Sequence, residues 1–167
     1  MAQTDLAANQ RDVPRWLSWA VVLLVAARVA AIVFLKNDAQ ELVQWVPLAR
    51  AEANASTSGR MIMYDFSAAW CGPCRAMDAA VFRDRTAATQ INSAVIPVRV
   101  VDRKQEDGKN PPEVEALQRR YAIRAFPTIV IVDTQGKERE RMEGFRGRRA
   151  FFEVVGKATR FSPPRGH

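Results

Sequence analysis

The stretch Met61-Ile-Met-Tyr-Asp-Phe-Ser-Ala-Ala-Trp-Cys-Gly-Pro-Cys74 places two cysteines, two residues apart, where an apolar run gives way to a helical pattern. Met61 to Phe66 is typical of a buried strand, and apolar residues recur at helical spacing after Cys74. Cys71 is therefore expected at a helix N-terminus, where backbone N–H groups and the helix dipole favour a thiolate. Cys74, one turn later, could attack a mixed disulfide formed by Cys71. The pattern predicts dithiol–disulfide exchange, with a nucleophile and a resolver.

Three other roles for the cysteine pair fit the composition less well. A structural zinc site needs about four nitrogen or sulfur ligands, whereas the 167-residue chain has these two cysteines and one histidine, His167. A structural disulfide would close a very short loop and remove little entropy from the unfolded chain. A catalytic cysteine–histidine pair would require His167 to fold back from the C-terminal tail. No metal is expected, and redox exchange is the favoured interpretation.

Residues 16–35 form a nearly continuous apolar stretch that is long enough to cross a bilayer as a helix. Trp16 and Trp19 suit one membrane interface, and the single charge, Arg28, can extend towards the other. A cleaved signal peptide is the alternative, but the apolar run exceeds the roughly 7–15 residues of a signal core. Lys and Arg near the two ends give no decisive orientation. We therefore expect an uncleaved anchor with the following domain exported, as is usual after a short N-terminal tail.

The chain is predicted to carry one folded domain behind this anchor, because the remaining length suits a single compact core. The expected parts are a tail (1–15), the transmembrane anchor (16–35), a linker (36–40), the domain (41–160) and a C-terminal tail (161–167).

The charge pattern favours a solvated surface rather than a nucleic-acid interface. The net charge is +7, and many basic residues fall after residue 136. Several of them alternate with Glu138, Glu140 and Glu143, which is typical of a solvated edge strand. Attraction to anionic headgroups is a second interpretation, and nucleic-acid binding is a third that no motif supports.

Strand and helix patterns alternate within 41–160. Strands are expected at 42–46, 61–66, 95–101, 128–133 and 138–144. Helices are expected from 48 to before 59, at 71–92, at 113–121 and at 147–159, with a loop at 102–112. Pro97 should lie near the start of its strand or at a sheet edge. This order predicts an α/β fold with a mixed central sheet and helices on both faces.

Three motifs together resemble the thioredoxin family. They are Asp65-Phe-Ser-Ala-Ala-Trp-Cys-Gly-Pro-Cys74, Ala125-Phe-Pro-Thr128 ahead of a strand, and Gly144-Phe145 after a hairpin. Val81-Phe82, the loop at 102–112 and the Gly-Phe pair make the chain similar, within that family, to the exported C-terminal domain of the thiol:disulfide interchange protein DsbD. The resemblance covers about residues 41–159 and implies a thioredoxin fold.

The resemblance implies roles for the residues at the dithiol. Cys71 would be the exposed attacking thiol, and Cys74 would be the buried resolving thiol that closes the redox disulfide with it. Gly72 and Pro73 would stiffen the turn and resemble the dipeptide of reducing thioredoxins. Asp65 matches the family's buried carboxylate. Burial should raise its pKa and suit it to take the proton of Cys74, unless it faces water at the strand end.

The resemblance also implies a substrate-binding surface. Pro127 would follow a cis peptide bond and place the Phe126 backbone where an incoming peptide can pair with it, unless Pro127 is an ordinary trans residue. Trp70 would flank and shield the dithiol, or belong to the core. Two positions depart from the family pattern: Ser67 stands where a second Trp is common, and Val98 where many members place a Lys near the buried Asp.

These features predict an anchored thiol–disulfide oxidoreductase in a bacterial inner membrane, with its domain in the periplasm, that reduces disulfides of exported proteins or apocytochromes. No Gly-x-Gly-x-x-Gly fingerprint is present, so no nucleotide cofactor is expected and a transmembrane disulfide reductase is the expected electron donor. Net oxidation or isomerisation is an alternative, because direction follows the potential difference with the surroundings. A binding module or assembly chaperone without turnover is a further alternative, against which the intact cysteine pair argues.

Overall fold

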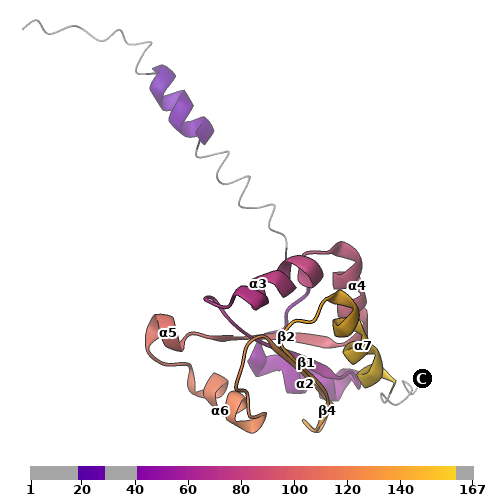
Figure 1. Ribbon diagram of the computed structural model, residues 1–167. Coiled ribbons are helices and arrows are strands. Elements are labelled where there is room, and N and C mark those ends of the chain that lie inside the picture. The colour runs from indigo at the N-terminus through magenta and orange to yellow at the C-terminus, as the bar shows by residue number, and fades with distance from the viewer. Residues whose placement is uncertain (1–18, 29–40, 161–167) are drawn as a thin grey trace, which may run out of the picture. The chain divides into compact units, whose positions relative to one another are not determined.

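The computed structural model describes residues 19–28 and 41–160, which belong to two separate units divided between Gln40 and Glu41 (Figure 1). In the first unit, residues 19–28 are helical. The rest of the expected anchor, the linker and both tails lie outside the described residues. Within the two described ranges, no helix has both the length and the apolar character needed to cross a bilayer.

The second unit is built on a four-stranded mixed sheet in the order β2-β1-β3-β4 (Figure 1). Its strands are β1 (Ile62–Ala68), β2 (Ile96–Asp102), β3 (Thr128–Val132) and β4 (Glu138–Glu143). β1 pairs with β2 in parallel and with β3 antiparallel, and β3 and β4 form an antiparallel hairpin. Every residue of β1 is buried, as expected for a central strand covered on both faces.

Helical segments connect and cover these strands. They are α2 (Leu48–Ser58), α3 (Gly72–Met77), the π-helix η1 (Asp78–Phe82), α4 (Arg85–Ala94), α5 (Lys104–Asp107), α6 (Pro112–Arg120) and α7 (Arg148–Thr159). α2 begins directly after Pro47, which suits a first helical turn, and ends at Gly59 with a left-handed φ of 68°. The predicted helices at 48–58, 113–121 and 147–159 are confirmed within a residue or two.

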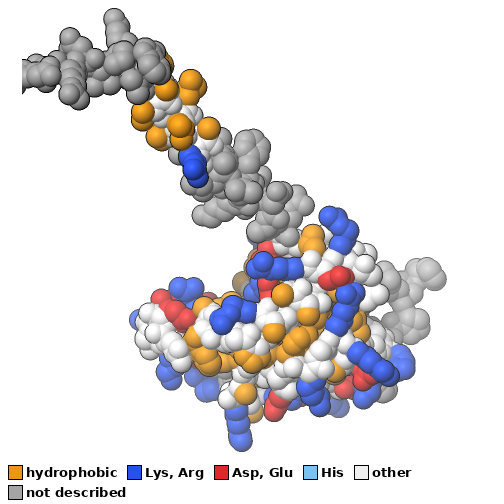
Figure 2. Space-filling view, turned by 45° about the horizontal axis from the view of Figure 1, so that its top comes forward, with side chains coloured by type: hydrophobic (Ala, Val, Ile, Leu, Met, Phe, Trp, Pro, Cys, Tyr) orange, Lys and Arg blue, Asp and Glu red, His pale blue; other side chains and the backbone are white. Residues whose placement is uncertain are grey.

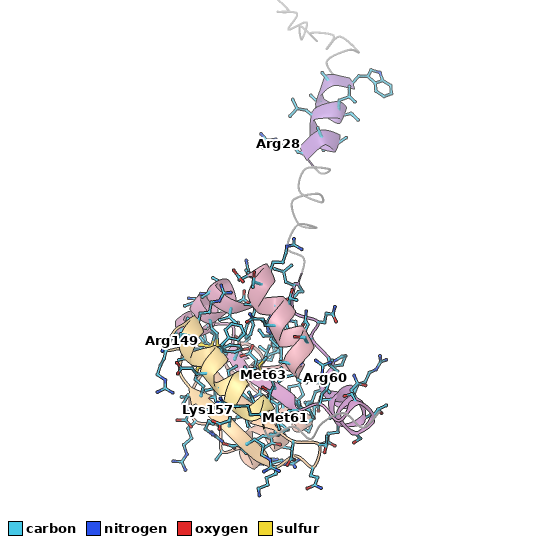
Figure 3. All side chains as sticks on the ribbon, turned by 90° about the vertical axis from the view of Figure 1, so that its right-hand side faces the viewer. Arg28, Arg60, Met61, Met63, Arg149 and Lys157 are labelled. Atoms are coloured by element: carbon cyan, nitrogen blue, oxygen red, sulfur yellow. A yellow bond between two sulfur atoms is a disulfide. The ribbon has the colours of Figure 1, made fainter. Side chains whose placement is uncertain are left out.

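Two apolar cores lie on opposite faces of the sheet. On one face, Met61, Met63 and Ile129 pack with residues of α3, η1, α4 and α7. On the other, alternate residues of β1, β2 and β3 pack with α2 and α6. Figure 3 shows Met61 and Met63 inside the domain, and Arg149 and Lys157 on the outer side of α7. The prediction of helices on both faces of a mixed sheet is confirmed.

The strand predicted at 42–46 is wrong, because these residues lie beside β2 without forming a ladder. The Val46 N–H donates to the carbonyl oxygen of Pro97 at 2.8 Å. Proline has no N–H with which to continue regular pairing at that position. Asn92 holds the segment instead: its Oδ1 accepts the Gln44 N–H at 2.8 Å, and its Nδ2 donates to Leu42 O at 2.9 Å. The expectation that Pro97 lies near the start of an edge strand is confirmed.

The single helix predicted at 71–92 is divided into α3, η1 and α4. The break falls at Arg83 and Asp84. Asp84 has an extended backbone, and its side chain accepts the Ala87 N–H at 2.8 Å, so it acts as the N-cap of α4. Arg148 of α7 also contacts Asp84, at 2.9 Å. The loop predicted at 102–112 contains the short helix α5.

β4 is a charged edge strand, as predicted. Arg141 forms ion pairs with Glu138 at 2.8 Å and with Glu143 at 3.1 Å. In Figure 2, Lys and Arg side chains are spread over the visible face of the domain, with fewer acidic side chains among them and apolar side chains between.

Candidate functional site

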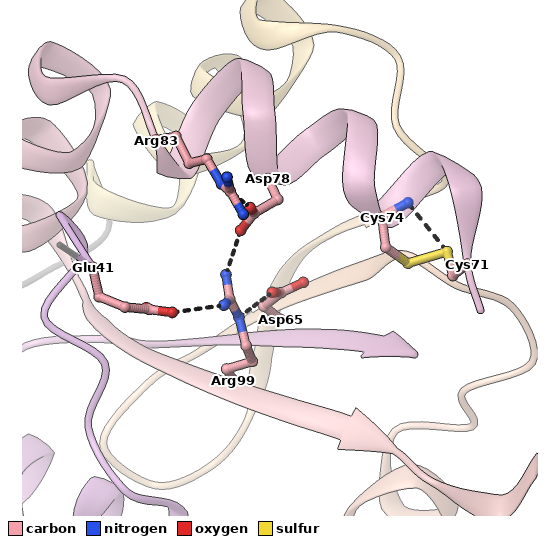
Figure 4. Close-up of polar contacts among 7 residues, drawn as sticks. All are labelled: Glu41, Asp65, Cys71, Cys74, Asp78, Arg83 and Arg99. Carbon is pink, nitrogen blue, oxygen red and sulfur yellow. Dashed lines mark hydrogen bonds and ion pairs between the residues drawn. A yellow bond between two sulfur atoms is a disulfide. The ribbon is translucent and has the colours of Figure 1, made fainter. Parts of the chain in front are cut away.

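The two cysteines lie where β1 passes into α3, and a disulfide joins them (Figure 4). Cys71 is the N-cap of α3, and Pro73 lies in the first turn, a position where its missing N–H is harmless. The Cys71 sulfur accepts the backbone N–H of Cys74 at 3.1 Å. The helix start therefore directs a hydrogen-bond donor at the sulfur of the first cysteine.

The expectation that Cys71 is exposed is wrong for this disulfide form. Cys71 is 2% exposed and Cys74 is 7% exposed. The physical reason is packing, because the disulfide lies in a small apolar cluster with Ala68, and Phe126 covers that cluster. Trp70 is 48% exposed and meets Phe126 edge to face, with ring centroids 5.9 Å apart. The Phe126 ring thus packs against the cysteine cluster, and the Trp70 ring packs against Phe126.

The loop before β3 lies beside the dithiol, and its Phe126–Pro127 peptide bond is cis, as predicted. Two hydrogen bonds fix the loop: the Thr128 hydroxyl donates to Ala125 O, and the Gly144 N–H donates to Pro127 O, each at 2.8 Å. Both partners belong to the β3–β4 hairpin or its ends. The sheet itself therefore positions Phe126 against the cysteine cluster.

Asp65 lies in the middle of β1 and is 1% exposed. The prediction of a buried carboxyl is confirmed, and the alternative of an aspartate facing water is wrong. The pKa of Asp65 is raised to about 6, chiefly because the carboxyl is buried; the charge and hydrogen bond of Arg99 lower the pKa, and the charge of Asp78 adds to the rise. Asp65 Oδ1 is buried and has no hydrogen-bond partner in the described part of the chain.

Arg99 supplies the positive charge beside Asp65. The β1–β2 register sets Arg99 opposite Asp65 and the fully buried Val98 opposite Tyr64. Val98, which stands where many family members have a lysine, is thus not the neighbour of Asp65, and the positive charge is supplied one residue later by Arg99. Arg99 Nε lies 3.4 Å from Asp65 Oδ2, and Arg99 Nη2 lies 3.0 Å from Asp78 Oδ1. Figure 4 shows this guanidinium between three carboxylates, the third being Glu41 at 3.4 Å.

Aromatic rings complete the surroundings of Arg99. Its Cζ atom lies 4.1 Å from the ring centroid of Trp45 and 5.4 Å from that of Phe82. Asp78 is shared with a second cation, because Arg83 Nε lies 2.6 Å from Asp78 Oδ2. The guanidinium of Arg99 is therefore held by charge on several sides and by an aromatic face.

A cavity of about 230 Å³ joins the buried carboxyl to the dithiol. Its lining includes Asp65, Cys74, Asp78, Arg99 and Ser67. The second cysteine and the proton-accepting candidate thus line one cavity. In the ranges that the structure describes, no three Cys, His, Asp or Glu side chains are grouped as ligands for a metal ion.

The sequence patterns missed Arg99, Asp78, Glu41 and Trp45. Two of them carry a detectable signal. Asp78 follows Cys74 by four residues and therefore shares its helix face. Arg99 is the single charge in the apolar run Val95–Val101, where a charge opposite the buried Asp65 needs a partner. Trp45 and Glu41 lie in irregular backbone, where periodicity predicts no contact.

Comparisons with known proteins agree with this geometry. The family model for thioredoxin-like domains matches residues 48–159. The thiol:disulfide interchange protein DsbD of Photorhabdus laumondii is 30% identical over 119 residues, which are 70% of this chain and 18% of that protein. The chain thus spans less than a fifth of that relative's length.

Solved structures show the same fold. DsbH oxidoreductase superposes with a TM-score of 0.62 at 22% identity, over 71% of this chain and 85% of that one. The oxidised C-terminal domain of Neisseria meningitidis DsbD superposes with a TM-score of 0.55 at 22% identity, over 66% of this chain and 90% of that one. The fold of residues 41–160 is therefore the thioredoxin fold.

Proposed function

The chain belongs to the thioredoxin-like family and is a thiol–disulfide oxidoreductase, and we propose that it reduces disulfides of exported proteins or apocytochromes. The observation that carries this proposal is the Cys71–Cys74 pair at a helix start, with the buried carboxyl of Asp65 on the same cavity as Cys74. The similarity to DsbD, a thiol:disulfide interchange protein by name, supports an envelope role.

In the proposed cycle, the reduced dithiol transfers two electrons to a substrate disulfide. The Cys71 thiolate attacks one substrate sulfur, forming a mixed disulfide and releasing the other substrate sulfur as a thiolate, which takes up a proton. Cys74 then loses its proton and attacks Cys71 Sγ. The Cys71–substrate bond breaks, the Cys71–Cys74 disulfide forms, and the second substrate sulfur leaves as a thiolate that is protonated by water.

Asp65 is proposed to accept the proton of Cys74 in the second step. Both residues line one cavity, and a pKa of about 6 leaves the Asp65 carboxyl mostly ionised at pH 7 yet more basic than an ordinary aspartate. The Cys74 N–H that points at the Cys71 sulfur would stabilise the Cys71 thiolate in the first step.

Trp70, Gly72, Pro73, Phe126 and Pro127 are proposed to form the surface that binds the substrate. Phe126 packs on the cysteine cluster and the exposed Trp70 packs on Phe126, and aromatic rings supply large contact area in protein interfaces. The loop of Phe126 and Pro127 is fixed by the β3–β4 hairpin, so its backbone is available at a constant position for an extended peptide.

Residues 16–35 are proposed to anchor the domain in a bacterial inner membrane with the dithiol in the periplasm. The apolar length of this segment and the similarity to DsbD support the proposal. A transmembrane disulfide reductase would then return two electrons to the Cys71–Cys74 disulfide.

Trapping of mixed disulfides tests the function. In the full chain, Cys74→Ser leaves Cys71 able to form a mixed disulfide but removes the resolving thiol, so exported proteins with cysteines are expected to be recovered covalently bound. Cys71→Ser is the matched control and should trap none. The proposal fails if Cys74→Ser captures nothing and the wild-type chain does not reduce insulin.

The direction of electron flow is tested by the reduction potential of the Cys71–Cys74 pair, measured against glutathione or dithiothreitol. A reductant is expected near the roughly −270 mV of thioredoxin, whereas a value near about −120 mV would indicate net oxidation.

A further inference from the structure

The segment that leads into the domain, residues 41–46, is fastened to the body of the domain. The backbone groups of Gln44 and Leu42 bond the side chain of Asn92, and the Val46 N–H bonds Pro97 O. Val43 is 2% exposed and lies in the core. We call residues 41–46 the leading segment. It is irregular in backbone but has fixed contacts along its length.

Trp45 of the leading segment lies between the core and the charged cluster. Its ring meets Phe82 edge to face, with centroids 5.0 Å apart, and Phe82 in turn packs on Phe151. The Arg99 guanidinium lies over the Trp45 ring, with Cζ 4.1 Å from the centroid. Phe82 thus packs against the indole ring, and the indole ring in turn contacts the guanidinium.

The position of Arg99 matters because carboxylates on different elements compete for it. Asp78 on η1 is nearer to the guanidinium, at 3.0 Å, than Asp65 on β1, at 3.4 Å, and Glu41 also lies at 3.4 Å. The charged and titratable groups on the cavity around Asp65 are Arg99 from β2, Asp78 from η1, and Cys74 and Arg75 from α3. Arg75 donates to Ala69 O at 3.0 Å. Asp78 and Glu41 therefore offer Arg99 alternative partners to Asp65.

We propose that Trp45 is a positioning residue for the resolving step, because its ring holds the Arg99 guanidinium beside Asp65 and so keeps Asp65 ionised and able to accept the Cys74 proton near neutral pH. Trp45 acts through Arg99 and touches neither cysteine. This inference rests on the proposed function, in which Asp65 takes that proton. The protonation of Asp65 would then depend on a residue that lies outside the sheet and helices that carry the dithiol.

Removal of the ring is expected to release Arg99 towards Asp78, Glu41 and solvent. Asp65 then keeps the cost of burial but loses its cation, so protonation is favoured. In Trp45→Leu, the ratio of ionised to protonated Asp65 at pH 7 is expected to fall about tenfold, the scale that one neighbouring charge produces. Trp45→Phe keeps an aromatic face and should retain most of the effect, since phenyl rings also bind cations.

The test is a pH titration of the Asp65 carboxyl carbon by NMR in the full chain with its disulfide formed, together with the pH–rate profile of insulin reduction. The matched control is Phe152→Leu. Phe152 is also half-buried against the same core, and Arg148 lies over its ring at 5.9 Å, away from the dithiol. A double variant, Trp45→Leu with Arg99→Met, tests whether Trp45 acts through Arg99.

The proposal is supported if the Asp65 midpoint rises in Trp45→Leu and stays near the wild-type value in Trp45→Phe and Phe152→Leu. In addition, the midpoint of the double variant must not be higher than that of Arg99→Met alone. The proposal is overturned if Trp45→Leu leaves the midpoint unchanged, or raises it equally when Arg99 is absent. Should Trp45→Leu fail to fold, the Asp65 midpoint is compared between Trp45→Phe and Trp45→His. Above pH 7 both variants keep an uncharged aromatic ring, whereas at acidic pH a charged histidine should repel Arg99. The proposal then requires a higher midpoint in Trp45→His, and equal midpoints overturn it. If Cys74→Ser traps no protein and the wild-type chain does not reduce insulin, the proposed function fails, while the NMR titration still tests whether Trp45 positions Arg99.

Discussion

Asp65 Oδ2 accepts a long hydrogen bond from Arg99 Nε at 3.4 Å, while the equally buried Asp65 Oδ1 has no partner among the described residues. A carboxylate in this position is only partly stabilised, and burial of such a group opposes folding. Burial, opposed by Arg99, holds the pKa of Asp65 at about 6, where the group can both take up and release a proton near neutral pH. Asp65 therefore lowers the stability of the fold, and the same burial gives it the raised pKa that suits proton transfer.

The first prediction is that Asp65→Asn removes a pH dependence of stability. The unfolded chain ionises Asp65 near the ordinary value of 3.8 and the folded domain near about 6, so unfolding releases a proton between these values. The contribution of Asp65 is therefore most favourable below pH 3.8, falls as pH rises to about 6, and is then constant. The total loss is about 3 kcal/mol.

Urea unfolding from pH 4 to pH 8 measures this effect as the difference between wild type and Asp65→Asn. Asp107→Asn is the control, because the Arg103 hydrogen bond lowers the pKa of the exposed Asp107 and gives the opposite sign. A wild-type curve parallel to that of Asp65→Asn would show that Asp65 is not a buried acid with a raised pKa.

The second prediction concerns Arg99→Met. Loss of the guanidinium removes an influence that lowers the pKa of Asp65, so the carboxyl should be about half protonated at pH 7 and exchange should slow about twofold there, recovering at higher pH. Insulin reduction from pH 6 to pH 9 measures the profile. Arg141→Met is the matched control, because Arg141 is equally exposed, at 26%, and binds carboxylates on the opposite edge strand. Equal slowing in both variants at every pH would exclude a local role for Arg99.

The buried residues of the site follow from sequence pattern, whereas the charged cluster does not. The apolar run before the cysteines predicts β1 and the burial of Asp65, because a central strand has no solvated face. The choice between Val98 and Arg99 as the neighbour of Asp65 depends on strand register, which is fixed by packing across the sheet. A shift of one residue exchanges the two positions.

Element boundaries that depend on a single side chain also escape periodicity. Apolar spacing continues through residues 71–92, yet the helix is interrupted at Asp84. This residue caps a new helix and binds Arg148 of α7. The contact between Asp84 and Arg148 spans 64 positions in sequence and depends on tertiary structure. Similarly, Leu42 to Val46 has strand composition, but Pro97 on the neighbouring strand prevents regular pairing.

The third prediction is that Asn110 fastens the loop after β2. Asn110 is 6% exposed, its Nδ2 donates to Asp102 Oδ2 at 2.6 Å, and its Oδ1 accepts the Arg103 N–H at 2.6 Å. Asn110→Ala leaves the Arg103 N–H without this acceptor and removes one of two side-chain donors to Asp102 Oδ2, the other being Gln118 Nε2 at 2.9 Å. The change should lower the free energy of unfolding by about 1–3 kcal/mol. Chemical denaturation measures the loss, with the exposed Asn54→Ala on α2 as control. Insulin reduction by the folded protein should not change, and a variant that is inactive but fully stable would contradict this structural role.

The last prediction distinguishes two roles of Phe126, which are covering the disulfide and contacting a protein substrate. The Phe126 ring packs on the cluster that contains the Cys71–Cys74 disulfide, and Cys71 is 2% exposed beneath it. Phe126→Ala should open access to the sulfur atoms, so reduction of the disulfide by dithiothreitol should quicken severalfold, because exchange rates depend on access. Exchange with a protein substrate should slow instead, because the aromatic contact surface is lost. Stopped-flow measurement of both reactions tests whether the first rate rises and the second falls, with Phe152→Ala on α7 as the control. If both reactions slow to the same extent, Phe126 supports the structure of the dithiol and does not cover it.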